Sequence, residues 1–421
     1  MIRKTSLSLV LCTFSFALFF SCSEESTEPT QANPKLAVSS ESCMFTKNFC
    51  QDILIISNEG AGELTWQIES KPAWIELSKQ NGTITTGNES VTISANMEQL
   101  TESTSGMIEL TSNGGDIDVP VNGYMKDWVR LADMPSARMF LASCVFNNII
   151  YAIGGSDING NEVGTVEAYD PSTNEWSTKS AMPTPRSGLT VCVLEKKIYA
   201  IGGGVGEWEQ KGLPLVEVYD PAQDSWSAGV DLPAGGGRIY HGTSVVNGKI
   251  YVIAGWYVIA ADGPRNTVFE FDPVSQQWEQ KSPIPTMRAF FNPAVVNNKI
   301  YIMGGHTWAQ NELKVNELYN PLTDGWETKA SMTLGAVLYG GGVVDGKIYI
   351  VGGSRYPYIF RQEVQIYNPV TDSWSSGPKN LPTPRLAFTS STVNGQIFII
   401  GGSLETDLDG APSKIVEAYD P

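Results

Sequence analysis

A tryptophan that recurs at nearly constant spacing constrains the fold of this 421-residue chain more than any other feature. The series is separated by 48, 50, 52, 48 and 48 residues and stands at positions 128, 176, 226, 278, 326 and 374. Each repeat also has an apolar run ending in a glycine pair, with Ala254 replacing one glycine, and an aromatic residue followed by Asp or Asn and Pro. A period near 50 residues is typical of arrays of β-sheet units, and Asp-Pro steps suit tight turns. The sequence therefore predicts a repeated β unit.

These motifs resemble the kelch family throughout residues 126–421. The resemblance implies an all-β propeller in which each repeat forms one blade, with strands a to d running from the axis to the rim. The tryptophan opens strand d, so the repeat region starts with a lone d strand at Trp128 and stops after a c strand near Tyr419. We therefore expect six blades, closed by pairing of the strand near Trp128 with the C-terminal strands. Such closure leaves no open edge in the ring.

An arginine stands nine residues before the turn between strands a and b in five repeats, and Ala336 takes its place in one. The five residues are Arg138, Arg186, Arg238, Arg288 and Arg385. Because strand a leaves the arginine end and strand b returns to it, the arginines and the b–c loops are expected on one face. One interpretation is that five guanidinium groups around a mouth bind a ligand carboxylate.

The other interpretation is that these arginines form structural ion pairs within each blade. A glutamate lies two residues before the strand-c aromatic in four repeats, at Glu167, Glu217, Glu317 and Glu417. The repeat that lacks arginine also has Gln365 in place of glutamate, whereas Phe269 beside Arg238 breaks the rule. The matched replacement favours ion pairs.

The b–c loops that follow the glycine pairs are rich in aromatic and polar residues. The candidate ligand-binding residues there are Trp208, Trp256, His306, Trp308, Tyr356 and Tyr358. Exposed aromatic rings beside hydrogen-bonding groups suit the face of a sugar or the side chains of a peptide. The alternative is that these rings pack between blades.

Residues 35–124 alternate apolar and polar side chains in short runs separated by Asn-Gly and similar turns, which predicts a β-sandwich. Its sequence Ser57-Asn58-Glu59-Gly60, Leu64-Thr65-Trp66, Lys71-Pro72-Ala73-Trp74-Ile75, Gln80-Asn81-Gly82 resembles the BACON domain. That resemblance implies an immunoglobulin-like module, which serves either carbohydrate binding or spacing. We expect Trp66 and Trp74 to be core residues rather than ligand platforms.

The first 21 residues have the pattern of a signal peptide, with Arg3 and Lys4 followed by an apolar stretch that is too short to span a membrane. The small residue before Cys22 resembles a bacterial lipoprotein signal, which implies a lipid on Cys22; the alternative is an ordinary cleaved signal. Residues 22–34 form an acidic, Pro-containing tether that resembles the surface-export signal of Bacteroidetes lipoproteins. We therefore expect domains at 1–21, 22–34, 35–124 and 125–421. The expected location is the outer membrane, facing the cell surface or the periplasm, with the lipid as the only membrane attachment.

An exported chain is permitted disulfides, and Cys43 and Cys50 are close enough in sequence to bridge adjacent strands. Glu405, Asp407 and Asp409 place oxygen ligands at alternate residues, as calcium loops do, although solvated acidic loops have the same pattern. No other cofactor is expected.

The chain has 28 basic and 45 acidic residues, and its net charge of −17 argues against a nucleic-acid partner. It has only two histidines and shows no nucleophile elbow, phosphate loop or zinc-protease motif. The leading hypothesis is a non-catalytic binding protein that engages glycan or protein through the b–c loop face. The enzyme alternative is a sugar mutarotase resembling N-acetylneuraminate epimerase, with Glu207, Glu209 and an arginine as candidate groups. A scaffold role is the third hypothesis, and ligand identity and oligomeric state stay open.

Overall fold

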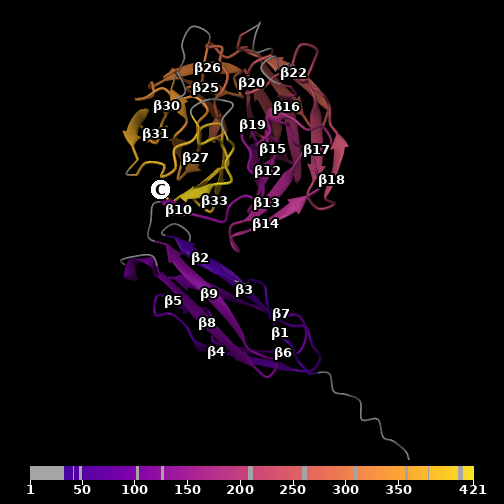
Figure 1. Cartoon of the computed structure of the whole chain (residues 1–421), viewed down its shortest axis with the longest axis vertical. Helices are drawn as coiled ribbons and strands as arrows, with labels where there is room; N and C mark the ends of the chain where they lie inside the picture. Colours follow the sequence, from indigo (N-terminus) through magenta and orange to yellow (C-terminus); the bar gives the residue numbers. More distant parts are fainter. Residues whose placement is uncertain are drawn as a thin grey trace, which may run out of the picture.

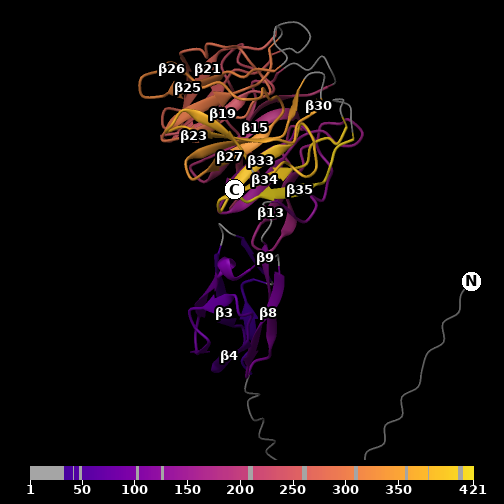
Figure 2. The same cartoon turned by 90° about the vertical axis from the view of Figure 1, so that its left-hand side faces the viewer.

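The computed structural model describes residues 33–40, 42–46, 50–100, 104–124, 128–206, 212–257, 263–307, 312–355, 359–377, 379–405 and 411–421. The expected signal peptide, Cys22 and most of the tether lie outside the described residues. The described residues form β-strands and one short 3₁₀ helix, and none of their helices is long and apolar enough to cross a membrane. They build two β domains, a sandwich that lies beside β10, β13 and β14 of a larger propeller (Figure 1, Figure 2).

The N-terminal domain packs two sheets face to face, with strand orders β1-β3-β7-β5 and β2-β9-β8-β4-β6. Trp66 and Trp74 are 2% and 7% exposed in the core between them, which confirms that both are core residues. The elements are β1 (Leu36–Val38), β2 (Cys43–Thr46), β3 (Gln51–Asn58), β4 (Leu64–Ser70), β5 (Ile75–Leu77), β6 (Asn81–Ile84), β7 (Asn88–Ala95), η1 (Met97–Gln99), β8 (Thr104–Ser112) and β9 (Ile117–Tyr124).

The expected disulfide of this domain is wrong, because Cys43 and Cys50 are both free thiols. Cys43 points into the sandwich core and is fully buried, whereas Cys50 is exposed just before β3. Burial raises the pKa of the Cys43 thiol to about 12, and the nearby Asp52 carboxylate adds to the effect. Closeness in sequence therefore did not place the two sulfurs together.

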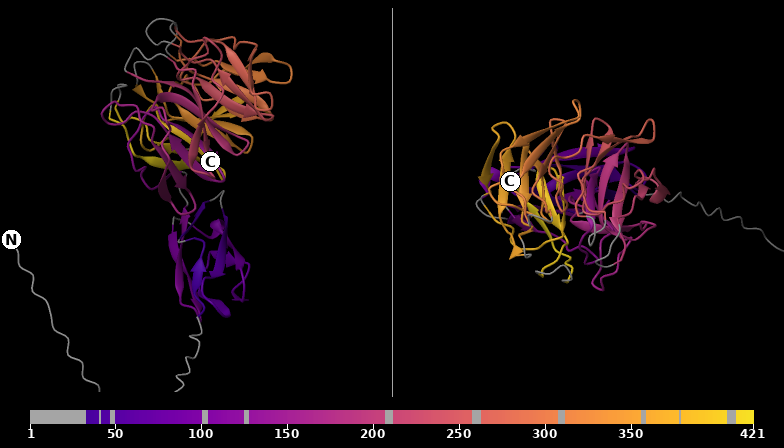
Figure 3. Two further views of the ribbon diagram at one scale, coloured as in Figure 1. Left: turned by 90° about the vertical axis from the view of Figure 1, so that its right-hand side faces the viewer. Right: turned by 90° about the horizontal axis from the view of Figure 1, so that it is seen from above.

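The described residues from 128 onward form six antiparallel four-stranded sheets arranged around an axis (Figure 3). Blades 1 to 3 comprise β11 (Ala142–Phe146), β12 (Ile149–Ile153), β13 (Val166–Asp170), β14 (Glu175–Lys179); β15 (Ser187–Leu194), β16 (Lys197–Gly204), β17 (Val216–Asp220), β18 (Ser225–Ala228); β19 (Gly242–Val246), β20 (Lys249–Ile253), β21 (Val268–Asp272) and β22 (Gln277–Lys281).

Blades 4 to 6 comprise β23 (Ala294–Val296), β24 (Lys299–Met303), β25 (Asn316–Asn320), β26 (Gly325–Lys329); β27 (Gly340–Val344), β28 (Lys347–Val351), β31 (Val364–Asn368), β32 (Ser373–Ser376); β33 (Thr389–Val393), β34 (Gln396–Ile400), β35 (Val416–Tyr419) and β10 (Trp128–Arg130). A small hairpin of β29 (Ser354–Arg355) and β30 (Ile359–Phe360) lies between β28 and β31.

Blade 6 closes the ring with strands from both ends of the propeller. The N-terminal strand β10 pairs antiparallel with β35, with Trp128 opposite Tyr419 and Arg130 opposite Glu417. The expected six-bladed, all-β propeller and its closure are therefore confirmed. Because β10 supplies the outer strand of blade 6, the ring has no missing strand.

The repeated tryptophans form an outer belt that joins neighbouring blades. Each indole N–H donates to a backbone carbonyl just after strand d of the preceding blade, as in Trp226 to Ser180 at 2.8 Å and Trp326 to Ser282 at 2.9 Å. Trp128 completes the belt by donating to Lys379 at 3.5 Å. Each repeated tryptophan therefore forms a hydrogen bond that links its blade to the preceding one.

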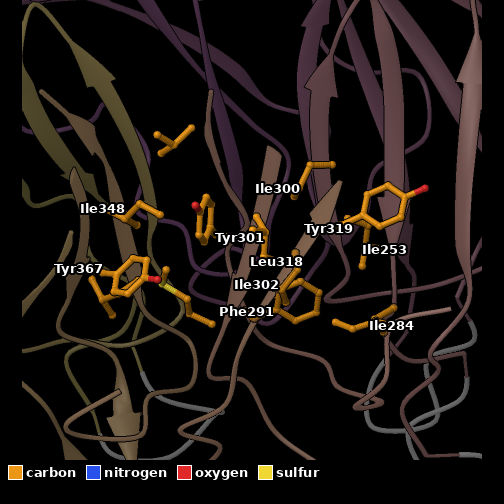
Figure 4. Close-up of a cluster of buried hydrophobic side chains, with 14 of the residues drawn as sticks. Ile253, Ile284, Phe291, Ile300, Tyr301, Ile302, Leu318, Tyr319, Ile348 and Tyr367 are labelled. Atoms are coloured by element: carbon orange, nitrogen blue, oxygen red, sulfur yellow. The ribbon is translucent and has the colours of Figure 1, made fainter. Parts of the chain in front are cut away.

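The core of the propeller lies between the blades. Figure 4 shows part of it, in which Ile253 of blade 3, Tyr319 of blade 4 and Tyr367 of blade 5 belong to one buried cluster. Apolar side chains on both faces of each sheet pack against its neighbours, since every blade has a blade on either side. The strand-a edges, in contrast, face the axis.

Candidate functional site

The five repeated arginines lie inside the blades, and each is at most 1% exposed. The Nη2 group of Arg138 donates to Glu167 at 2.7 Å, and the Nη1 group of Arg385 donates to Glu417 at 2.8 Å. The equivalent ion pairs are Arg186 with Glu217 and Arg288 with Glu317. Burial lowers the pKa of Arg385 to about 10, although Glu417 acts in the opposite direction. The structure therefore confirms the ion pairs that the sequence favoured in these four repeats and corrects the ligand-binding interpretation, because the guanidinium groups are enclosed within the blades.

The glycine pairs explain why the arginines point inward. Arg138 Nη1 donates to the carbonyl of Gly154 at 2.8 Å, and Arg288 Nη1 donates to that of Gly304 at 2.7 Å. Gly154 has φ of 65°, and a β-carbon there would lie 2.8 Å from the carbonyl oxygen of Arg186 in the next blade. The arginine and the glycine pair are thus one structural unit.

A third member of this unit was missed in the sequence. A hydroxyl residue two positions before the arginine donates to the second oxygen of the glutamate in the four blades that have the ion pair. These bonds are Ser136 to Glu167 (2.7 Å), Thr184 to Glu217 (2.9 Å), Thr286 to Glu317 (2.8 Å) and Thr383 to Glu417 (2.7 Å). The signal was visible, because the residue two before Arg238 is Gly236, in the repeat that also lacks the glutamate.

Blades 3 and 5 replace the ion pair in different ways. In blade 3 the Arg238 guanidinium carbon lies 4.8 Å from the centre of the Phe269 ring, and burial lowers the pKa of Arg238 to about 9. Such a contact between a cation and a ring partly offsets the missing carboxylate. In blade 5 the Gln365 amide exchanges hydrogen bonds with the backbone N–H and C=O of Leu334, at 2.8 and 3.0 Å.

A ring of backbone hydrogen bonds surrounds the axis two residues after each arginine position. The residues at this position all have a left-handed backbone: Phe140, Gly188, Tyr240, Phe290, Leu338 and Ala387, with φ of 53°, 62°, 52°, 59°, 53° and 57°. Each N–H from Phe140 through Leu338 donates to the carbonyl of the equivalent residue in the preceding blade, at 2.8 to 3.2 Å. This ring fixes the side chains at one mouth of the axial channel.

The channel opens at this ring into a cavity of about 160 Å³ that is lined by residues of all six blades. None of the lining residues is Asp, Glu, Lys or Arg, although the chain carries 73 such residues from 28 basic and 45 acidic side chains. Strand a is an edge strand in every blade, so backbone N–H and C=O groups also face the axis. The cavity is therefore polar but uncharged.

One polar cluster of the wall belongs to blades 2 and 3. The hydroxyl oxygen of Thr190 lies 2.7 Å from His241 Nε2 and 2.5 Å from the Thr243 hydroxyl. Burial lowers the pKa of His241 well below its usual value, with Arg238 adding to the effect. The imidazole is therefore neutral near pH 7, and its Nδ1 has no hydrogen-bond partner within the described residues.

A second polar cluster lies on blades 6 and 1. The Ser143 hydroxyl lies 2.8 Å from that of Thr389, and the Ser390 hydroxyl bonds both the N–H and the C=O of Gly341 at 2.8 Å. The side-chain amide of Asn292 in blade 4 donates to the Ser390 hydroxyl of blade 6 at 3.4 Å, across the intervening blade 5. The first three residues of strand a of blade 5 are Gly340, Gly341 and Gly342, so no side chain stands between Asn292 and Ser390 there.

Aromatic rings cover one side of the mouth. Tyr240 and Phe290 stack with ring centres 4.2 Å apart and planes at 27°, and Phe140 approaches Tyr240 at 5.3 Å. All three side chains are half-buried, so part of each ring meets solvent. The equivalent positions of blades 2 and 6 are Gly188 and Ala387, which have no large side chain of their own. The Tyr240 ring lies over Gly188, where an added β-carbon would be 2.8 Å from it, and Phe140 and Leu338 pack against the cluster that contains Ala387.

The predicted b–c loop residues divide into two groups. Trp256 is only 3% exposed and packs on Phe290 and His306, with ring centres 5.5 Å apart in each contact, while His306 is half-buried. Trp256 therefore supports the aromatic wall from behind, which corrects the expectation that it meets a ligand directly. Trp208, Trp308, Tyr356 and Tyr358 lie outside the described residues.

The calcium hypothesis stays a prediction, because two of its three residues lie outside the described residues. Glu405 is exposed and described, whereas Asp407 and Asp409 lie outside the described residues. In the described part of the chain, no group of three or more His, Cys, Asp or Glu side chains is placed to hold a metal ion.

Comparison with protein families agrees with this geometry. The KLHDC2/KLHL20/DRC7 Kelch-repeats domain matches residues 125–305, and the Kelch motif matches residues 287–333, 336–381 and 384–421. The propeller is built from kelch repeats. The Viral BACON domain matches residues 35–125, so a BACON domain precedes the kelch repeats.

Similar proteins of known name share the kelch region. Beta-scruin of Limulus polyphemus is 28% identical over 206 residues, which are 48% of this chain and 16% of scruin. Kelch-like protein 40 of Xenopus tropicalis is 30% identical over 205 residues, covering 46% of this chain and 32% of that protein. The chain thus spans about a third or less of these relatives. The solved structure of YjhT aligns with a TM-score of 0.59 and 17% identity over 68% of this chain and 95% of YjhT, which shows a shared fold.

Proposed function

We propose that this kelch protein is a non-catalytic binding protein that holds a glycan or protein partner at the aromatic mouth of its propeller. The observation that carries the proposal is the convergence of half-exposed rings and uncharged hydrogen-bonding groups from six blades on one cavity. Binding sites typically combine an apolar wall with a few placed polar groups. Kelch repeats are also shared with the kelch-like proteins above, which is consistent with a protein partner.

The lining of the cavity supports binding rather than proton-transfer chemistry. Burial moves the pKa of His241 far below neutrality and that of Tyr339 far above its usual value. Neither group is therefore poised to exchange a proton near pH 7, as a general acid or base must be. The mutarotase alternative loses its expected arginine, since the ring arginines are enclosed, and Glu207 and Glu209 lie outside the described residues.

We also propose that the protein is exported and anchored by a lipid on Cys22, so that the propeller works at the cell surface or in the periplasm. Residues 1–34 support this location through their signal-like and tether-like sequence. We assign no cofactor.

The proposal is tested by binding to a broad glycan array and to a displayed peptide library. The variants Tyr240→Gly and Phe290→Gly remove the stacked rings, and glycine suits their left-handed backbone, as Gly188 does in blade 2. We expect each to weaken the interaction detected with the wild type by roughly tenfold or more. The control Val274→Ala changes an 89% exposed apolar side chain in the same blade as Tyr240.

Two results would count against the proposal. One is a folded wild type that binds nothing on either array; the other is a partner that both glycine variants bind as tightly as the wild type does. Faster anomeric exchange of N-acetylneuraminate, followed by NMR, would favour the mutarotase instead.

A further inference from the structure

We infer that the axial cavity accepts one uncharged sugar residue of a glycan partner, inserted through the aromatic mouth. The inference rests on the proposed function and names the ligand class of the same site. It follows from four properties of the cavity: its charge, its hydrogen-bonding groups, its aromatic rim and its size.

The charge of the cavity excludes an ionised ligand group. The lining residues carry no acidic or basic side chain except neutral His241. The nearest arginines are already bonded to glutamates or to backbone carbonyls, as for Arg186 with Gly202 and Ala200. A carboxylate entering this space would leave water without gaining a counter-charge, which is costly. Acidic sugars are therefore disfavoured.

The polar groups of the wall are of the kind that match ligand hydroxyls. Thr190, Thr243, Ser143, Thr389 and Ser390 each carry a hydroxyl, which donates one hydrogen bond and accepts two. Ser143 and Ser390 already use all three of their hydrogen-bonding positions within the protein, whereas the bonds that the three threonines make within the described residues use only part of theirs. Asn292 adds a side-chain amide, so the polar groups of the cavity wall include both donors and acceptors.

The wall combines an apolar rim with polar groups deeper in the cavity, as binding of a sugar ring requires. Phe140, Tyr240 and Phe290 form the apolar rim at the mouth, and Thr190, Thr243 and Thr389 place hydroxyl groups along the cavity wall. A pyranose has an apolar face of C–H groups and a rim of hydroxyls. The apolar face of the sugar can pack on the aromatic rings, and its hydroxyl groups can hydrogen-bond to the polar groups of the cavity wall.

The size of the cavity limits what enters it. A volume of about 160 Å³ has room for about 11 to 16 water molecules, since one water needs about 10–15 Å³ on this measure. That is comparable to a hexose, which has about a dozen non-hydrogen atoms. The cavity therefore takes a single sugar residue end-on, and the remainder of the glycan extends past the mouth.

The experiment compares neutral sugars with acidic sugars, using the full chain. Saturation-transfer NMR and calorimetry are run with the methyl glycosides of glucose and galactose, and with those of glucuronate and galacturonate, in which a carboxylate replaces the C6 hydroxymethyl group. We expect saturable binding of at least one neutral glycoside. Its uronate counterpart should bind at least tenfold more weakly.

Two variants test whether the sugar binds in the cavity. Thr243→Val and Thr389→Val remove one hydroxyl each from opposite clusters without changing side-chain shape, and should weaken neutral-sugar binding at least fivefold. Thr243→Ser and Thr389→Ser keep the hydroxyl and should bind nearly as the wild type does. Thr178→Val, at an exposed position of β14, is the matched control and should change nothing. If a valine variant fails to fold, its serine partner and the charge comparison still decide the result.

Several outcomes would overturn the inference. Equal or tighter binding of the acidic glycosides, full binding by both valine variants, or no binding of any sugar would each do so. If no sugar binds but a peptide ligand is lost in Tyr240→Gly and Phe290→Gly, the inference fails and the proposed function stands. If nothing binds at the mouth, both fail.

Discussion

The buried arginine of each blade shows how one residue organises its surroundings. Its guanidinium group reaches the carbonyl of a glycine pair and the carboxylate of strand c, as Arg288 does with Gly304 and Glu317. Ion pairs that are removed from water cost desolvation energy, and breaking one leaves an unpaired buried charge. Removal of the arginine alone should therefore lower the free energy of unfolding more than removal of both members of the ion pair.

We expect Arg288→Ala to lower the free energy of unfolding by about 3–5 kcal/mol, because it leaves Glu317 buried without its cation. Blade 5 offers a matched control, since Ala336 and Gln365 occupy the same two positions there. The double variant Arg288→Ala/Glu317→Gln should lose less than the single one. Urea unfolding followed by tryptophan fluorescence measures both, and equal losses would contradict this account.

The turn between strands c and d carries a second repeated interaction. The Tyr219 hydroxyl donates to Asp224 at 2.6 Å, and Tyr367 donates to Asp372 at the same distance. In each case the tyrosine hydroxyl holds the pKa of the aspartate below its ordinary value of 3.8. Blade 1 has Asn174 at this position, where Tyr169 donates to it at 2.8 Å.

These turns predict a specific acid sensitivity. A carboxyl whose pKa is lower in the folded state stabilises the fold above its ordinary pKa, and that stability is lost as the pH falls through the lowered value. The variant Asp224→Asn/Asp372→Asn should therefore show a flatter decline of the thermal midpoint between about pH 5 and pH 2. Near pH 7 it should be less stable than the wild type, because the ionised carboxylates no longer contribute, and the two thermal midpoints should converge at low pH. Calorimetry at several pH values tests this against Glu175→Gln, which removes an exposed acidic charge; an equal flattening in that control would refute it.

At the scale of the whole molecule, the ring is closed by strands from the two ends of the propeller region. Strands β10 and β35 are adjacent in the sheet although nearly the whole propeller sequence separates them. The Trp128 side chain packs on Tyr419 with ring centres 4.9 Å apart. The segment before the sandwich holds the expected lipid site, so that a tether, a sandwich and a propeller follow one another along the chain.

The proposed anchor predicts where the protein is found. The variant Cys22→Ser removes the only thiol at the expected lipidation position and should move the protein from the membrane fraction to the soluble fraction. Fractionation with labelled fatty acid measures both location and lipid incorporation. Cys12→Ser, within the expected signal peptide, is the control and should leave the protein at the membrane. A Cys22→Ser protein that stays lipid-labelled would exclude the anchor.

The architecture follows from sequence alone because its determinants are local and repeated. The tryptophan period, the glycine pairs and the surplus d strand indicate six blades and their closure, and the pairing of Trp128 with Tyr419 confirms this. Only the tertiary structure decided the site. The matched replacement at Ala336 and Gln365 already favoured the ion pair of Arg138. Whether Trp256 is a platform or a support, and whether Cys43 meets Cys50, depend on side-chain direction. Direction is set by packing against a neighbouring blade or sheet, and a repeat pattern does not contain that contact.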